Sequence, residues 1–345
     1  MNVKKQILAK LDKVYAVSPI QIDGLTYFLA ATEEHGKCLI FSPPQWKGSV
    51  VWNGPGGCMS LIPMPGRDKA FVAIEGFFPI FKSEHAGIVY VEGGEVIAEP
   101  WCVTRVIDLP FVHRIGIVPV GSIPFIVAAS LCGGKAFQDD WSQPGAVYAG
   151  PIPEDPSDKW SLEPILEGIS KNHGMHMTVV DGKPVVMVSG KEGLFMLQVP
   201  EKPGLQWQYE QLLEHEVSDI YSYDIDGDGI PEIMAIEPFH GNRIVIHKRM
   251  IKDWQPVFEK SIDFGHVIWA GEILGETAVL GGCRGDSKEL FLLRPKTSDL
   301  KTMSQEILDS NVGPTQIAVV HKRDYDLVVS ANHGSNEVAL YELTL

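Results

Sequence analysis

The 345-residue sequence has no apolar run close to the ~20 residues that a membrane-spanning helix needs. It also lacks a secretion signal, because Lys10, Asp12 and Lys13 interrupt the apolar stretch near the N-terminus. The five cysteines are irregularly spaced and include no CxxC pair, which favours reduced thiols. We therefore expect a cytoplasmic protein without a membrane-spanning segment.

Clustered positive charge is missing as well. The chain has 29 Lys and Arg residues against 44 Asp and Glu residues, a formal net charge of −15. Binding to nucleic acid or to an anionic membrane needs grouped Lys and Arg, so we exclude both as partners. A small neutral or cationic ligand remains open, and so does a homo-oligomer. The chain also has no GxSxG, HExxH or Walker A motif.

Glycine and proline are plentiful, with 34 and 24 residues scattered along the chain, which indicates short strands joined by tight turns. One pattern of strand, turn, strand, loop and strand occurs seven times. The first strand of each copy begins near one of seven positions: Tyr15, Cys58, His113, His176, Asp219, His266 and Thr315. Such units at roughly 40–50 residues predict an all-β, seven-bladed β-propeller of four-stranded blades.

The ends of the chain suggest how the ring closes. The last copy lacks a fourth strand, because only two residues follow its third. Residues 4–15 resemble the fourth strand of another copy and precede the first unit. We expect this N-terminal strand to complete the last blade, so that residues 1–345 form a single domain without a free edge.

Seven positions that open the first strands should face the central axis, and several carry His or Asp. Converging imidazoles suit Zn²⁺ or a similar ion, so we predict a transition-metal site of His113, His176 and His266, with Asp219 as a substitute or supporting residue. His173 is a further candidate in the approach loop. The alternative is that these residues cap strands and bind channel water. Arg114 should point away unless the strand start is irregular.

Loops between second and third strands should reach the same face and supply further groups. We predict His240 or His333 as a catalytic base and Lys135 or Glu75 as the acid. Trp141, Asp140 and Arg284 would bind the substrate, the Trp by stacking on a sugar ring. The alternatives are a packed Trp141 and histidines that serve only the hairpin, because His-Gly recurs at one repeat position.

The segment Tyr223–Ile233, "YDIDGDGIPEI", has aspartates at alternate positions and glycines that permit left-handed turns. Hard oxygen ligands in such a loop suit Ca²⁺. This loop, the "PEI" strand and the "HGxN" hairpins resemble FG-GAP/VCBS-type propeller repeats. The resemblance implies a structural calcium ion bound by Asp224, Asp226, Asp228 and Glu232. An empty Asp-rich turn is the alternative.

Residues 111–118, 128–150 and 172–190 are similar to the propeller domain of the aldos-2-ulose dehydratase family. This resemblance implies a metal-dependent carbon–oxygen lyase, a dehydratase or β-eliminase, acting on a keto-sugar or keto-glycoside at the axial opening. A sugar isomerase with the same metal site is a close variant. A non-catalytic carbohydrate-binding propeller and a protein-interaction propeller are the alternatives from other classes.

Overall fold

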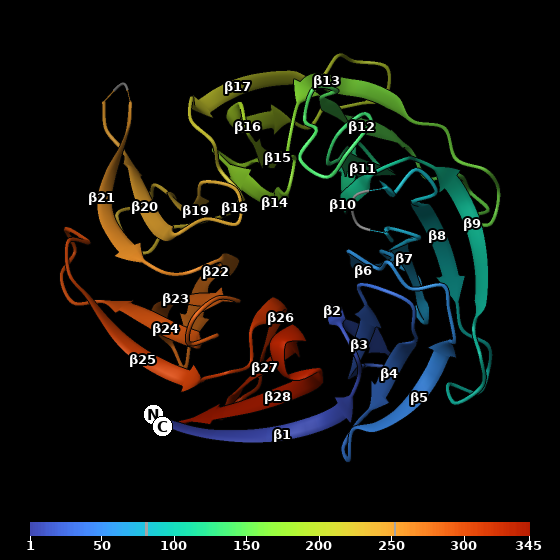
Figure 1. Cartoon of the computed structure of the whole chain (residues 1–345), viewed down its shortest axis with the longest axis horizontal. Coiled ribbons are helices and arrows are strands. Elements are labelled where there is room, and N and C mark those ends of the chain that lie inside the picture. Colours follow the sequence, from blue (N-terminus) through green and yellow to red (C-terminus); the bar gives the residue numbers. More distant parts are fainter. Residues whose placement is uncertain (80–81, 252) are drawn as a thin grey trace.

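The computed structural model describes residues 1–79, 82–251 and 253–345 and shows seven four-stranded antiparallel sheets. The sheets are arranged as blades around a central axis (Figure 1). The predicted all-β, seven-bladed propeller is therefore confirmed. Within the described residues, no helix has the length and hydropathy needed to cross a membrane. The cytoplasmic location stays a prediction.

The blades follow one another along the chain, each running from the axis outward. Blade 1 is β2 (Val14–Ile22), β3 (Leu25–Thr32), β4 (Cys38–Ser42) and β5 (Lys47–Trp52); blade 2 is β6 (Leu61–Pro63), β7 (Ala70–Glu75), β8 (Gly87–Glu92) and β9 (Cys102–Asp108). Blade 3 is β10 (Val112–Val120), β11 (Ile123–Ser130), β12 (Gly145–Pro151) and β13 (Glu163–Ile169); blade 4 is β14 (Gly174–Val180), β15 (Lys183–Gly190), β16 (Gly193–Gln198) and β17 (Gln208–Leu213). Blade 5 is β18 (Asp219–Tyr223), β19 (Glu232–Glu237), β20 (Arg243–Arg249) and β21 (Trp254–Ser261); blade 6 is β22 (Gly265–Ile273), β23 (Glu276–Cys283), β24 (Leu290–Pro295) and β25 (Met303–Asp309). Blade 7 is β26 (Pro314–His321), β27 (Asp326–Asn332), β28 (Glu337–Thr344) and β1 (Asn2–Lys10), with the short 3-10 helix η2 (His333–Ser335) between β27 and β28.

The ring closes through the N-terminal strand, as predicted. Strand β1 pairs antiparallel with β28, from Asn2 opposite Thr344 to Lys10 opposite Glu337. The two chain ends therefore lie together at the rim of blade 7 (Figure 1). This pairing covers the last exposed edge of that blade.

The core lies between the blades and consists of seven apolar clusters, one at each junction of neighbouring blades. Strand β27 is almost continuously apolar because it packs against a neighbouring blade on each face. Leu327, Val329 and Ala331 pack towards blade 1, whereas Val328 packs towards blade 6. A strand that is covered on both faces loses the alternation of a half-exposed strand, because both sets of side chains are buried.

Candidate functional site

Four innermost strands begin with a β-bulge whose extra residue is buried at the axis. The pairing register slips at Tyr15 in β2, His113 in β10, His266 in β22 and Thr315 in β26. A bulge leaves one residue unpaired and re-aims its side chain. Four blades thus direct an equivalent side chain towards the axis by the same backbone irregularity.

Polar contacts connect these bulge residues across the blades. The Tyr15 hydroxyl lies 3.3 Å from Nε2 of His266 and 3.5 Å from Nε2 of His113. The Thr315 hydroxyl donates to the carbonyl of Tyr15 at 2.8 Å, and His266 Nδ1 donates to the carbonyl of Thr315 at 3.0 Å. Because a carbonyl oxygen only accepts, the proton of His266 is on Nδ1 and Nε2 presents a lone pair.

Two further histidines meet His266 at the axis. His173 directly precedes β14, and His240 lies in the loop after β19 with a left-handed φ of 47°. The His240 backbone N–H donates to Ser218 Oγ at 3.1 Å, which holds this loop to the start of blade 5. One ring nitrogen from each of His173, His240 and His266 lies within 4.8 Å of the others.

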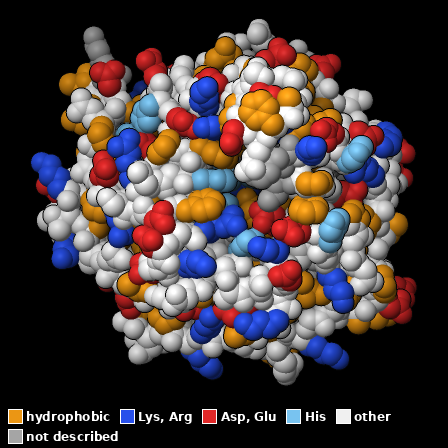
Figure 2. Space-filling view, in the orientation of Figure 1, with side chains coloured by type: hydrophobic (Ala, Val, Ile, Leu, Met, Phe, Trp, Pro, Cys, Tyr) orange, Lys and Arg blue, Asp and Glu red, His pale blue; other side chains and the backbone are white. Residues whose placement is uncertain are grey.

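One nitrogen–nitrogen distance in this group matches the separation of two ligands of a metal ion. Nε2 of His173 and Nε2 of His240 are 3.4 Å apart, longer than a normal hydrogen bond. A tetrahedral ion with nitrogen ligands at 2.0–2.1 Å separates those ligands by about 3.3–3.5 Å. Figure 2 shows histidine side chains beside Lys and Arg side chains at the centre of this face.

Burial keeps the axial imidazoles neutral, as metal ligands must be. It lowers the pKa of His173, His266 and the neighbouring His113 well below the usual value. Burial, followed by the positive charge of Arg284, lowers the pKa of His240 to about 3. A protonated imidazole in this group would be unpaired and desolvated, which is costly. Each ring can therefore offer a lone pair near neutral pH.

The predicted trio of His113, His176 and His266 needs correction. His176 lies inside β14, where its ring packs on Tyr221 at 4.0 Å between centroids instead of joining the axial group. The residue that blade 4 supplies is His173, which directly precedes β14, and β14 pairs with β15 without a bulge. His113 lies beside the group, with its ring centroid 4.6 Å from that of His173.

Arg114 points inward, as expected only for an irregular strand start, because the bulge at His113 turns it towards the axis. Its guanidinium donates to the carbonyl of His173 at 2.8 Å and to that of Met59 at 3.2 Å. It also lies 3.6 Å from the carboxylate of Asp219. Asp219 is thus an ion-pair partner of Arg114, and it is outside the group of metal-ligating nitrogens. Burial raises the pKa of Asp219 to about 6 although Arg114 opposes this.

His333, predicted as a base, belongs to a second polar group at the opening. Its Nε2 lies 2.6 Å from a carboxylate oxygen of Glu33, and its ring nitrogens lie 3.2 and 3.3 Å from Nη2 of Arg284. Burial raises the pKa of Glu33, but the hydrogen bond and charge of His333, together with the charges of Arg284 and Lys13, outweigh this and leave the pKa below its usual value. Sequence reasoning missed Glu33, although its place in the loop after β3 was a signal.

The recurring His-Gly pairs are explained chiefly by their glycines. A Cβ atom at Gly241 would lie 2.1 Å from the Glu237 carbonyl, and one at Gly334 would lie 2.9 Å from the Val312 carbonyl. The preceding histidines then differ in their contacts: His35 packs on Phe78, His240 joins the axial group and His333 binds Glu33. The glycine of each pair therefore serves the hairpin backbone, whereas each histidine makes contacts of its own.

The predicted loop residues Lys135, Asp140 and Trp141 contact one another. The Lys135 ammonium donates to the carbonyls of Gln138 and Asp140 and lies 3.3 Å above the Trp141 ring centroid. The Asp140 carboxylate accepts from the Ala136 backbone N–H and from Ser142, which lowers its pKa to about 2. Trp141 is half-buried and packs edge-on against Phe239, a neighbour of the axial group.

Glu75, the other predicted acid, forms an ion pair with Arg105 of the same blade at 3.1 Å. Arg105 also donates to the carbonyls of His85 and Ala86. The carboxylate is therefore committed to the framework of blade 2. The role of Glu75 as an acid stays a prediction.

The predicted calcium loop already contains a cation from the protein. The Lys248 ammonium contacts Asp226, lies 2.6 Å from Asp228 and lies 3.1 Å from Glu232. Asp224 accepts hydrogen bonds from the backbone N–H groups of Gly227 and Gly229, both at 2.8 Å. Ca²⁺ would have to displace the Lys248 ammonium from these carboxylates. Calcium binding by this loop stays a prediction.

No protein-family model and no curated protein sequence matches this chain. Among solved structures, it is similar to the PQQ-bound form of aldose sugar dehydrogenase from Streptomyces coelicolor. The TM-score is 0.51 at 13% sequence identity, and the match covers 100% of this chain and 99% of that chain. A likeness at this identity shows the fold alone.

These comparisons correct two predictions. The resemblance to FG-GAP/VCBS repeats is confirmed only as a seven-bladed propeller with four-stranded blades, since no family model matches. The prediction of a carbon–oxygen lyase is wrong, because the sugar-acting propeller that the fold resembles is a dehydrogenase. The resemblance to the aldos-2-ulose dehydratase family is not confirmed.

Proposed function

We propose that the axial opening is the active site of a carbohydrate-acting enzyme that binds a divalent transition metal through His173, His240 and His266. The observation that carries this proposal is three neutral imidazoles whose nitrogens lie within 4.8 Å of one another. Three protein ligands leave a coordination position open for a substrate oxygen, and the ion would act there as a Lewis acid.

The rest of the opening suits a small polar ligand. Phe239 and Trp141 provide ring surfaces beside the histidines, and sugars bind aromatic faces through their apolar side. Arg284 and the Glu33–His333 pair provide a charged donor and a carboxylate for hydroxyl groups. The likeness of the fold to a sugar-acting propeller supports a small carbohydrate as substrate.

The roles that we propose for several residues differ from the roles expected from the sequence. His240 is a metal ligand in this proposal and not a base. Both ring nitrogens of His333 are engaged, by Glu33 and by Arg284, so His333 positions those two groups. Arg114 holds the His173 backbone through its carbonyl and is a positioning residue.

The residues do not fit PQQ, the cofactor of the similar dehydrogenase. PQQ carries three carboxylates and would need several free cationic donors. Three nearby cations are already partnered: Arg114 by carbonyls and Asp219, Lys171 by Glu216 at 2.6 Å, and Lys135 by carbonyls of its own loop. Arg284 contacts His333 and the Phe264 ring, and a single guanidinium is too few for three carboxylates. The centre of the opening is built of neutral imidazoles, so we assign no step to PQQ.

The test is metal-dependent sugar binding. Chelator-treated protein is reloaded with Zn²⁺, and binding of a panel of aldoses and ketoses is measured by calorimetry, followed by NMR detection of products. We expect binding of at least one sugar to need the metal and to weaken about tenfold or more in His240→Ala. The control is His176→Ala, which removes an imidazole outside the axial group. Equal sugar binding with and without metal would contradict the proposal.

A further inference from the structure

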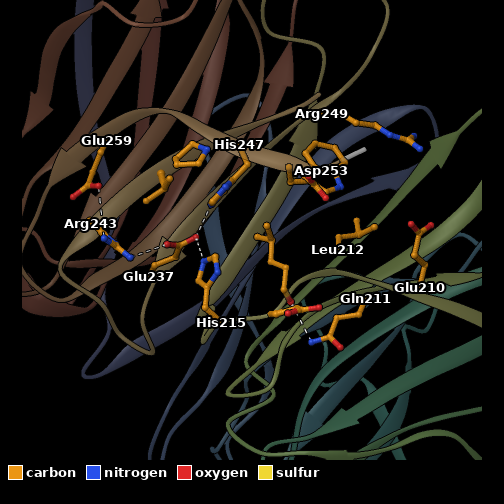
Figure 3. Close-up of a pocket in the computed structure, with 15 residues that line it drawn as sticks. Glu210, Gln211, Leu212, His215, Glu237, Arg243, His247, Arg249, Asp253 and Glu259 are labelled. Atoms are coloured by element: carbon orange, nitrogen blue, oxygen red, sulfur yellow. Dashed lines mark hydrogen bonds and ion pairs between the residues drawn. The ribbon is translucent and has the colours of Figure 1, made fainter. Parts of the chain in front are cut away.

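A groove of about 610 Å³ lies away from the axis, between the outer strand of blade 4 and blade 5. Figure 3 shows the side chains that line it, with His215, Glu237 and His247 pointing towards one another. His215 comes from the segment that connects β17 to β18, and the other two come from β19 and β20. The groove is therefore formed by segments of two adjacent blades.

Strand β20 supplies the groove through its alternation. Arg243, Val245, His247 and Arg249 occupy every second position and line the groove. Ile244 and Ile246, on the other face, belong to the core between blades 5 and 6. Glu237 is the last residue of β19 and pairs directly with Arg243, so the register of the two strands brings its carboxylate to the same face.

Both histidines point at one carboxylate oxygen. Nε2 of His247 lies 2.7 Å and Nε2 of His215 lies 2.9 Å from Oε1 of Glu237, which are hydrogen-bond distances. One candidate ligand atom from each residue lies within 4.8 Å of the others, and a shared ion would replace these hydrogen bonds and separate its ligand atoms to about 3.3–3.5 Å. The other carboxylate oxygen, Oε2, lies 3.3 Å from Nη2 of Arg243. Arg243 thus fixes the orientation of the carboxylate while leaving Oε1 to the histidines.

A buried carboxylate and an excess of acidic side chains both favour a bound cation in this groove. Glu237 is 1% exposed and His247 is 3% exposed, whereas His215 is accessible from the groove. Nδ1 of His247 has no hydrogen-bond partner among the described residues. In the part of the chain that the structure describes, the groove is lined by five acidic side chains and two arginines: Glu210, Glu214, Glu237, Asp253 and Glu259 against Arg243 and Arg249. A cleft with an excess of one sign concentrates ions of the opposite sign.

We propose that His215, Glu237 and His247 form a second divalent transition-metal site, separate from the axial group. Two imidazoles and one carboxylate are a ligand set that Zn²⁺ and related ions take in proteins. Three protein ligands leave an open position, which faces the groove. Arg249, which lines the same groove, suits a small oxyanion or carboxylate as the further ligand. This site stands independently of the function proposed for the axis.

The experiment uses Co²⁺ as the probe, since its visible absorption reports its ligands. Metal-free His240→Ala protein, in which the axial group is disabled, is titrated by absorbance and calorimetry. We expect one equivalent of Co²⁺ to bind, and we expect the additional His215→Ala change to weaken this binding about 100-fold or more. His215 is exposed in a connecting segment, so its replacement should leave the fold intact. Circular dichroism checks this.

Glu210→Ala in the same background is the matched control, because Glu210 lines the groove without belonging to the ligand set. It should retain the bound Co²⁺. Absence of binding in the His240→Ala protein, or equal binding with and without His215, would overturn the proposal. Failure of the axial proposal would appear differently, as no change in metal content on His240→Ala in otherwise unmodified protein.

Discussion

At the scale of single residues, the position of protons decides what the axial histidines can do. His266 carries its proton on Nδ1 because the Thr315 carbonyl accepts it, and this leaves Nε2 directed towards the Tyr15 hydroxyl. A hydrogen bond to the far nitrogen of a metal-ligating histidine is the usual way in which proteins orient such a ring. Tyr15, with a pKa raised to about 12 by burial, stays a neutral hydroxyl, and its contact with Nε2 competes with a metal ion for that lone pair.

Lys248 allows a prediction about calcium. Lys248→Ala removes the ammonium from between Asp226, Asp228 and Glu232, which leaves unpaired carboxylates that attract Ca²⁺. We expect calcium affinity to rise about tenfold or more, since the competing charge is gone. Calorimetry and a calcium-dependent shift in melting temperature measure this effect. Without calcium, the variant should unfold at a lower temperature than the unmodified protein.

The control for this prediction is Lys183→Ala, which removes one positive charge from an exposed position on blade 4. Lys183→Ala and Lys248→Ala therefore change the net charge of the protein by the same amount. Identical calcium responses in Lys248→Ala, Lys183→Ala and unmodified protein would show that the loop does not bind calcium under competition from Lys248.

At the scale of elements, strand pairing between β1 and β28 depends on one carboxylate. Glu337 begins β28 and is contacted by Lys5 and Lys10 of β1, the latter at 2.9 Å. Burial raises the pKa of Glu337, but hydrogen bonds from Lys5, Lys10 and Asn332 lower it to about 2. This depressed pKa adds stability above the unfolded pKa of about 4.3, and the added stability is lost as the pH falls towards 2.

Glu337→Gln should therefore reduce the free energy of unfolding at pH 7 and flatten its decline between about pH 5 and pH 2. The expected loss at pH 7 is about 1–2 kcal/mol, because water screens the exposed Lys10. Urea unfolding followed by tryptophan fluorescence gives the values. Glu210→Gln, an exposed carboxylate on β17, is the control. A pH profile of the Gln variant that runs parallel to that of the unmodified protein would contradict the assignment.

The elements also show what the sequence could and could not predict. The strands were predictable because their apolar runs and turn residues repeat seven times, and the last copy visibly lacked a strand. The inward turn of Arg114 was not predictable, since a bulge depends on the pairing register and not on residue type. Likewise, the repeat pattern placed His176 at the start of the first strand of blade 4. Strand β14 pairs without a bulge, and the residue that joins the axial group is His173.

The site at the groove was invisible to sequence reasoning for a related physical reason. His215, Glu237 and His247 come from two blades and share no motif spacing, so only the packing of blade 4 on blade 5 brings them together. Lys248 illustrates the opposite case. The sequence of the Asp-rich loop predicted a cation site, but the ammonium of Lys248, from the adjacent strand β20, binds its carboxylates.

At the scale of the whole molecule, the ring is held closed by β1. Deleting residues 1–10 would expose the eight-residue edge of β28 and uncover apolar contacts of Val3, Leu8 and Ala9. We expect the melting temperature to fall by roughly 10 °C or more and the protein to aggregate through the open edge. Calorimetry and size-exclusion chromatography measure these two effects.

A circular permutant provides the control for closure. The chain ends are adjacent, with the Asn2 side-chain amide donating to the Leu345 carbonyl at 3.2 Å. Joining residues 1–10 to the C-terminus through a short Gly-Ser linker restores the strand from the other side. If the permutant melts no higher than the truncated protein, the strand pairing is not what maintains the ring.

The central claim is that the axial histidines hold a transition metal, and elemental analysis tests it most directly. Protein purified without a metal-affinity column is compared with the His240→Ala and His176→Ala variants by mass spectrometry. We predict that unmodified protein and His176→Ala hold one transition-metal ion per chain more than His240→Ala, because the groove site binds its own ion in all three. An unchanged metal content in His240→Ala, after reloading with Zn²⁺, would contradict the account.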